Sequence, residues 1–333
     1  MQLYNEQFET DLEYFNRRHL LFKHQKLYPS NDQLEHIQTI ITDVEKALKL
    51  VSDKLCDELK ADSPEAQNES DSSENDKYRV LKGVMRVGFI SKGLLLKTDK
   101  FLHLVMLCLT KPTIALLERV ASELRSILIN YKIDINIANA CLNIHKLYYN
   151  VQLSFTSSEY VNDSPDTNSN QAFHLPKQVC LEHLTEIKRA RWFQEQLLPI
   201  SNALLILRIL RDYCQRDPVW SVLNTWTLEV LVSKCFLHKP FERVGHKFRS
   251  IIEAIASGIL SVTPQSNLNK YLLDPCESCE KIVNDYLTVQ QSECITASAQ
   301  HMLRLIAFKQ IYKTLEINRL EVQCSSNNAN NSS

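Results

Sequence analysis

Apolar residues recur every three or four positions near the start of the chain, which predicts one long amphipathic helix. The polar cluster Ser30-Asn31-Asp32 precedes it, and residues of this kind are favoured at helix N-caps. Over residues 31–59 the spacing places these side chains on one face: Leu34, Ile37, Ile40, Ile41, Val44, Leu48 and Val51. We assign residues 1–59 to an N-terminal helical segment that packs on the lobe after it.

Alternating apolar and polar residues from Val80 to Phe155 predict β-strands, interrupted by a helix over Pro112–Leu128. Residues 61–76 come before this stretch and hold six acidic residues and no basic one, so we expect a flexible insertion at 60–78. A second polar loop follows at 157–170. The pattern therefore predicts an α/β lobe over residues 79–176.

Helical spacing dominates the second half of the chain. The expected helices cover these ranges: 177–195, 200–216, 220–237, 241–257 and 289–315. Prolines 218, 240, 264 and 275 lie in or near the breaks. We expect an all-helical lobe over 177–318 and a disordered tail over 319–333, and thus an α+β chain with a mixed-sheet lobe followed by a helical one.

Residues 83–110 have the outline of a nucleotidyltransferase active-site hairpin, but they lack its acids. Two-metal nucleotidyl transfer needs two carboxylates on one strand face, at positions i and i+2. In the second strand of the hairpin these positions hold His103 and Val105, and the later strand at 147–155 has no acidic residue. We expect no two-metal catalysis, and we expect His103 to be a packed or cleft-lining residue rather than a ligand.

Nucleotide binding without turnover is compatible with the same hairpin. The turn after its first strand contains Gly88, Ser91 and Lys92, whose backbone and side chains could meet phosphates. Arg208 and Arg211 share one face of a predicted helix and could reach a cleft between lobes. The alternative is that these arginines pair with acidic residues such as Asp212 or Glu229. The sequence predicts either no cofactor, or ATP or another nucleoside triphosphate that is bound without turnover.

Charge and cysteine content limit the partners and the cellular compartments that are expected. A net charge of −1 gives no overall attraction to nucleic acid, so any RNA contact needs a local patch. The sequence MQLYNEQFETDLEYF predicts no signal peptide, and no run of about 18 apolar residues predicts a membrane span. Ten cysteines without a repeated spacing indicate reduced thiols in the nucleus or cytoplasm. Cys276, Cys279, Cys294 and His301 could ligate zinc, but their spacing does not favour a compact site.

Five separated motifs resemble the DZF domain family. They are VLKGVMRVGFISKGLLLKTD at 80–99, RARWFQ at 189–194, LRILRD at 207–212, LDPCE at 273–277 and TASAQH at 296–301. The resemblance covers about residues 10 to 318. Within the family, the chain is most similar to the DZF region of zinc-finger RNA-binding proteins. It implies a degenerate nucleotidyltransferase-like fold, regarded as catalytically inactive, that serves as a dimerisation module for RNA-binding proteins. A zinc-finger pattern of two cysteines and two histidines does not occur in these 333 residues.

The resulting hypothesis is a non-catalytic module that heterodimerises through its helical lobe in nuclear RNA metabolism. The family resemblance implies a DZF partner such as interleukin enhancer-binding factor 2, with RNA bound through other regions or by the complex. Candidate interface residues are Trp220, Trp226, Leu228, Leu231 and Val232. These residues could instead fill the helical core. Two other functions remain open: a nucleoside triphosphate sensor or residual nucleotidyltransferase, and a direct RNA-binding module.

Overall fold

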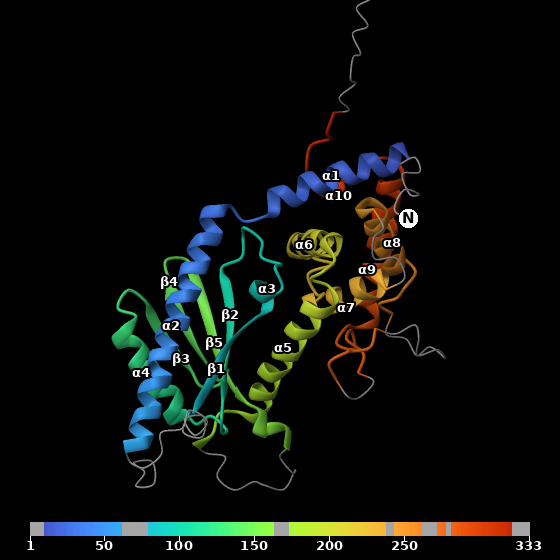
Figure 1. The fold of residues 1–333 in the computed structure, drawn as a ribbon. Helices are drawn as coiled ribbons and strands as arrows, with labels where there is room; N and C mark the ends of the chain where they lie inside the picture. The colour runs from blue at the N-terminus through green and yellow to red at the C-terminus, as the bar shows by residue number, and fades with distance from the viewer. Residues whose placement is uncertain are drawn as a thin grey trace, which may run out of the picture. The chain divides into compact units, whose positions relative to one another are not determined.

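The computed structural model describes residues 10–61, 79–162, 173–237, 243–261, 272–277 and 281–321 (Figure 1). They form two compact units. The sheet unit comprises the described residues of 28–199 and 275–278, and the helical unit comprises those of 10–27, 200–274 and 279–321. The expected insertion at 60–78 and tail at 319–333 lie almost wholly outside the described residues, as does the loop beyond residue 162.

A five-stranded mixed sheet forms the centre of the sheet unit. Its strands are β1 (Leu81–Val87), β2 (Phe101–Cys108), β3 (Lys132–Asn136), β4 (Cys141–Lys146) and β5 (Tyr149–Ser157). The spatial order is β1-β2-β5-β4-β3, in which β2 and β5 run parallel and the other neighbours run antiparallel. The crossover from β2 to β5 includes α4 (Ile114–Ile127), β3 and β4. The strands and the mixed sheet expected from the alternation are thus confirmed.

One face of the sheet is covered by α2 (Asn31–Ala61) and α4 (Figure 1). The apolar stripe of α2 is buried against this face, as its helical spacing predicts. Thr113 caps α4, because its side chain accepts a hydrogen bond from the backbone N–H of Leu116 at 3.1 Å. The sheet side of this core is formed by alternate strand residues: Leu102, Leu104, Leu142, Ile144, Val151, Leu153 and Phe155.

Helix α5 (Lys177–Gln196) belongs to the sheet unit, so the expected start of the helical lobe at residue 177 is wrong. Ala190 and Ile187 of α5 pack against Val87 of β1 and Val105 of β2. Thr156 of β5 also donates a hydrogen bond to a carbonyl of the same helix. The helix therefore lies on the sheet face opposite α2 and α4. Helical spacing predicted α5 correctly, but it did not predict the surface against which α5 packs, because that depends on tertiary structure.

The helical unit contains α6 (Ser201–Arg216), α7 (Thr225–Phe236), α8 (Val244–Ala256), α9 (Val289–Ala307), α10 (Ile311–Thr314) and the N-terminal α1 (Asp11–Leu27). Packing of the whole segment 1–59 on the sheet lobe was expected, and for α1 this is wrong. Helix α1 contacts α6 and α8. A Cβ at Gly245 in α8 would lie 3.2 Å from the carbonyl oxygen of Glu13, so glycine permits this close approach.

Two expected helices differ most from the structure in their ends. Helix α7 begins at Thr225 rather than at residue 220, because Asn224 caps it by accepting the N–H of Thr227 at 2.8 Å. The expected helix over 289–315 is divided into α9 and α10. Lys309 lies at the division with φ +54°, in the left-handed region that interrupts a helix.

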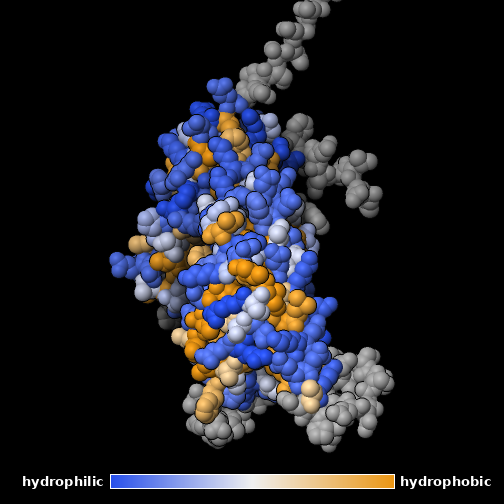
Figure 2. Space-filling model, turned by 90° about the vertical axis from the view of Figure 1, so that its left-hand side faces the viewer, coloured by the Kyte–Doolittle hydropathy of each residue, from blue (hydrophilic) through white to orange (hydrophobic). Residues whose placement is uncertain are grey.

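The outer surface of the sheet unit retains apolar side chains between polar ones, and Figure 2 shows this mixture on one face of the molecule. Leu50, Ile127 and Ile129 are among its exposed apolar residues. Scattered apolar exposure of this kind is normal for a folded domain. No helix in the described part of the chain is long and apolar enough to cross a membrane.

Candidate functional site

The first part of the candidate site is the tight turn where β1 meets α3 (Gly88–Ser91). Gly88 has φ +61°, a conformation that favours glycine. The Ser91 hydroxyl donates back to the Gly88 carbonyl at 3.1 Å. Lys92 is buried, and its Nζ lies 5.6 Å from the centroid of the Phe193 ring. The three residues expected to meet phosphate thus lie together, but the Lys92 ammonium is packed over an aromatic ring of its own unit.

A row of polar side chains crosses the sheet face toward α5. The register places His103 of β2 beside Gln152 of β5, Gln152 beside Asn143 of β4, and Asn143 beside Asp134 of β3. Their immediate neighbours along each strand point to the opposite, apolar face. This row was not found from the sequence, because it depends on the register of strands that are distant along the chain.

His103 is fixed within this row by a serine. Its Nε2 lies 3.0 Å from the Ser154 hydroxyl oxygen, and the Gln152 amide donates to the same oxygen at 3.4 Å. Ser154 is fully buried. His103 is therefore a partly buried side chain whose ring is held by a contact with the Ser154 hydroxyl. The serine and the glutamine lie on the later strand in which an acid was sought.

Val105 occupies the second position expected for a metal-binding acid. It is fully buried against Val87 and Ala190, beneath α5. A hydrocarbon side chain cannot bind a cation, and its surroundings do not solvate one. No group of three or more His, Cys, Asp or Glu side chains suited to a metal ion occurs among the residues that the structure describes.

His183 of α5 also lies at the site, and the sequence analysis missed it. Its ring centroid is 6.0 Å from that of His103, in an edge arrangement, and its Nε2 lies 3.0 Å from the Asn139 carbonyl oxygen. Burial lowers the pKa of His183 despite that carbonyl and despite Glu182 and Glu186. Helical spacing predicted the helix around His183, but nothing in the sequence indicated that this face would meet β2.

Burial lowers the pKa of His103 to about 4, with a smaller contribution in the same direction from His183; Glu186 opposes both effects. His103 is thus a neutral imidazole at pH 7. A neutral imidazole can exchange hydrogen bonds with a base or hydroxyl group, but it offers no positive charge to a phosphate. It is also a poor match for Mg²⁺, which prefers oxygen ligands.

Arg208 and Arg211 lie in the helical unit, whereas Gly88, Ser91 and Lys92 lie in the sheet unit. Both arginines are buried. The Arg208 Nη1 lies 2.7 Å from Nε2 of His24 in α1. Burial, followed by this guanidinium, lowers the pKa of His24 to about 4. These residues therefore contribute to the interior of the helical unit, where Asp212 forms ion pairs with Lys23 and Arg216, each at 2.8 Å.

The five candidate interface residues are all buried within the chain: Trp220, Trp226, Leu228, Leu231 and Val232. The Trp220 indole donates to the Ser298 hydroxyl at 2.9 Å, and the Trp226 indole donates to an Asp274 carboxylate oxygen at 2.8 Å. Their assignment as an exposed interface is wrong, and they fill the helical core. Aromatic and branched apolar residues occur in both settings, so composition alone does not separate them.

Family models match nearly the whole chain. The DZF N-terminal domain matches residues 9–197, and the DZF C-terminal domain matches residues 202–332. Two solved bacterial structures are similar in fold. One is the cyclic AMP-GMP synthase DncV of Vibrio cholerae, described as a prokaryotic cGAS homologue, at 11% identity and TM-score 0.59 over 95% of this chain and 98% of that one.

The second is CdnC of E. coli MS115-1 with ATP, at 13% identity and TM-score 0.56 over 92% of this chain and 99% of that one. At such low identities these structures show a shared nucleotidyltransferase-like fold and nothing about shared chemistry. The two family models divide the described residues close to the end of α5. The chain belongs to the DZF family.

Proposed function

We propose that this chain is a DZF module that does not transfer nucleotides and acts by pairing with another DZF protein in nuclear RNA-binding complexes. The observation that carries the proposal is the strand face below α5. On this face His103 and Val105 occupy the alternating positions at which carboxylates of a two-metal site are expected, and Gln152 lies beside His103.

The chemistry of that face supports a role without catalysis. Mg²⁺ clamps the attacking and leaving oxygens only when carboxylates anchor it. Here the first position is an imidazole with a lowered pKa, and the second is a valine buried under α5. Hydrogen bonding to Ser154 also holds the imidazole in the sheet. The site is therefore better suited to maintaining the fold than to activating a phosphate.

Pairing requires an exposed apolar surface, and the helical unit has apolar side chains that its own core does not cover. Phe308 at the end of α9 is 74% exposed, and Leu237 at the end of α7 is 67% exposed. These residues replace the five buried ones as interface candidates, because interface cores are enriched in large apolar side chains. The family resemblance supports a DZF partner such as interleukin enhancer-binding factor 2.

The pairing is tested by co-expressing the chain with interleukin enhancer-binding factor 2 and measuring mass by sedimentation equilibrium. We expect a 1:1 complex. The variant Leu237→Asp with Phe308→Asp should weaken it at least about tenfold, since two buried apolar contacts would be replaced by charges. The matched control is Ile129→Asp, because Ile129 is 83% exposed but lies in the sheet unit.

Three outcomes would change this proposal. A monomer that ignores DZF partners at micromolar concentration would contradict the pairing and favour a nucleoside triphosphate sensor. Weakening by Ile129→Asp alone would move the interface to the sheet unit. Salt-dependent RNA binding by the isolated chain would favour a direct RNA-binding module. A nuclear location is part of this proposal and is checked by imaging the tagged full-length protein.

A further inference from the structure

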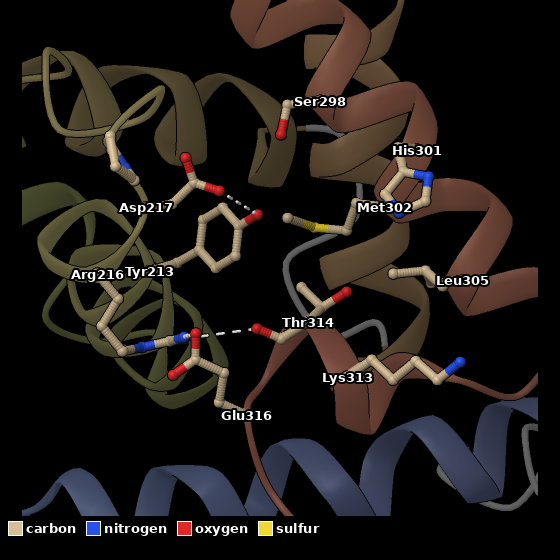
Figure 3. Close-up of a pocket in the computed structure, with 11 residues that line it drawn as sticks. Tyr213, Arg216, Asp217, Ser298, His301, Met302, Leu305, Lys313, Thr314 and Glu316 are labelled. Carbon is tan, nitrogen blue, oxygen red and sulfur yellow. Dashed lines mark hydrogen bonds and ion pairs between the residues drawn. The ribbon is translucent and has the colours of Figure 1, made fainter.

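A pocket of about 570 Å³ lies within the helical unit, lined by the end of α6, the middle of α9 and the α10 segment (Figure 3). All of its lining residues belong to that one unit. The volume is in the range of sites that hold small molecules, about 300 to 1,000 Å³. None of the residues assigned to the nucleotidyltransferase-like site contributes to it.

The apolar part of the pocket is formed by Tyr213, Met302 and Leu305. The hydroxyl of Tyr213 donates to an Asp217 carboxylate oxygen at 2.9 Å. Burial, assisted by this carboxylate, raises the pKa of Tyr213 to about 12, so the phenol stays protonated. Its hydroxyl is engaged, and its ring forms part of the wall beside Met302 (Figure 3). A thioether and an aromatic ring together favour an aromatic guest.

Thr314, one of the residues around the pocket, has a buried hydroxyl group. Thr314 is 7% exposed, and its Oγ1 makes no hydrogen bond among the described residues. In Figure 3 this hydroxyl points away from Arg216, toward the side of Leu305. The oxygen atom is closed to solvent, so a molecule bound in the pocket does not reach it.

The pocket also contains a guanidinium that is held by an exposed acid. Arg216 Nη1 lies 2.7 Å from a carboxylate oxygen of Glu316, whose side chain is 64% exposed. Glu316 has φ +49°, a conformation that is unfavourable for a glutamate. Asp212, by contrast, is a buried partner of the same arginine. Glu316 is therefore the partner that a competing anion can displace most readily.

We propose that this pocket binds a small aromatic molecule that carries one anionic group. The ring lies against Tyr213 and Met302, and the anion takes the place of Glu316 at Arg216. Lys313 is exposed at the pocket and adds a second positive charge. This site does not depend on the pairing or on the absence of catalysis, because its residues take part in neither.

The proposal is tested with 2-naphthoate and, as its neutral counterpart, 2-naphthylmethanol. The chain has four methionines, so methyl-¹³C-methionine NMR gives few signals, and Met302→Leu identifies the one in the pocket. Met85 and Met106 lie in the sheet unit and serve as internal controls. We expect 2-naphthoate to shift the Met302 signal saturably, and the neutral compound to bind about fivefold more weakly.

Variants test the anion contact and supply matched controls. Glu316→Gln should tighten 2-naphthoate binding severalfold and leave the neutral compound unchanged, because a competitor for Arg216 loses its charge. Thr314→Val should change neither, because the Thr314 hydroxyl oxygen is closed to solvent and does not meet the guest. Lys281→Glu, an exposed charge change elsewhere in the same unit, should change neither. An unmoved Met302 signal at every soluble concentration, or tighter binding of the neutral compound, would overturn the proposal. So would weaker binding of 2-naphthoate by Glu316→Gln.

Discussion

The two faces of the five-stranded sheet are made from the same strands, yet one carries apolar side chains and the other carries a row of polar ones. Toward α2 and α4, alternate residues such as Leu104 and Leu153 are fully buried among other hydrocarbon groups. Toward α5, the residues between them form a polar row that includes His103 and Gln152. The apolar face therefore stabilises the sheet whichever side chains the other face carries.

The largest expected effect comes from a substitution on the apolar face. Leu153→Ala should lower the free energy of unfolding by about 2 to 5 kcal/mol, because it removes buried hydrocarbon and leaves a cavity. The adjacent Gln152→Ala, on the polar face, should cost less than about 1 kcal/mol. Urea unfolding of both variants measures the difference. Equal losses would contradict the division of roles between the two faces.

Acid should destabilise the protein partly through His103. Its pKa is about 4 in the folded chain and about 6.5 when unfolded, so the unfolded state takes up the proton first as pH falls. The stabilisation is complete above pH 6.5 and is lost as pH falls toward 4, by about 2 to 3 kcal/mol. His103→Asn should remove this part of the pH dependence, measured by urea unfolding at several pH values. An unchanged slope would show that His103 is not buried as described.

The smallest expected effect concerns the contact that orients this histidine. Ser154→Ala removes the hydroxyl 3.0 Å from Nε2 of His103 and should cost about 0.5 to 1.5 kcal/mol. Thermal unfolding measures the cost. The conservative Ser154→Thr keeps the hydroxyl and serves as the comparison, although its added methyl needs space. If Ser154→Ala leaves stability unchanged while Ser154→Thr lowers it, packing rather than the hydrogen bond determines this position.

The sequence predicted the elements of the fold better than their partners. The period of α2 and the alternation of the strands are local properties, and both were confirmed. The partners of α1 and α5 were not predictable, because an amphipathic face does not specify which surface covers it. The role of Gly245, which lets α1 approach α8, was not predictable either, because it depends on a backbone contact with a residue far away in the sequence.

The candidate site was predictable to the same limited extent. The absence of acids at His103 and Val105 follows from alternation along a single strand, so it was visible in the sequence. Ser154 and His183 reach the site only through strand register and helix packing. The burial of Trp220 and Trp226 was also not predictable from the sequence. Their hydrogen bonds to Ser298 and Asp274 join residues that are far apart in the chain.

The measurement that tests the central claim most directly is a nucleotide incorporation assay on the chain, alone and with its DZF partner. An RNA primer is supplied with each labelled nucleoside triphosphate in turn, with Mg²⁺ or Mn²⁺. We predict no primer extension and no release of pyrophosphate, because His103 and Val105 cannot anchor the two metal ions. Extension of the primer by any nucleotide, lost in the His103→Ala variant, would contradict the account.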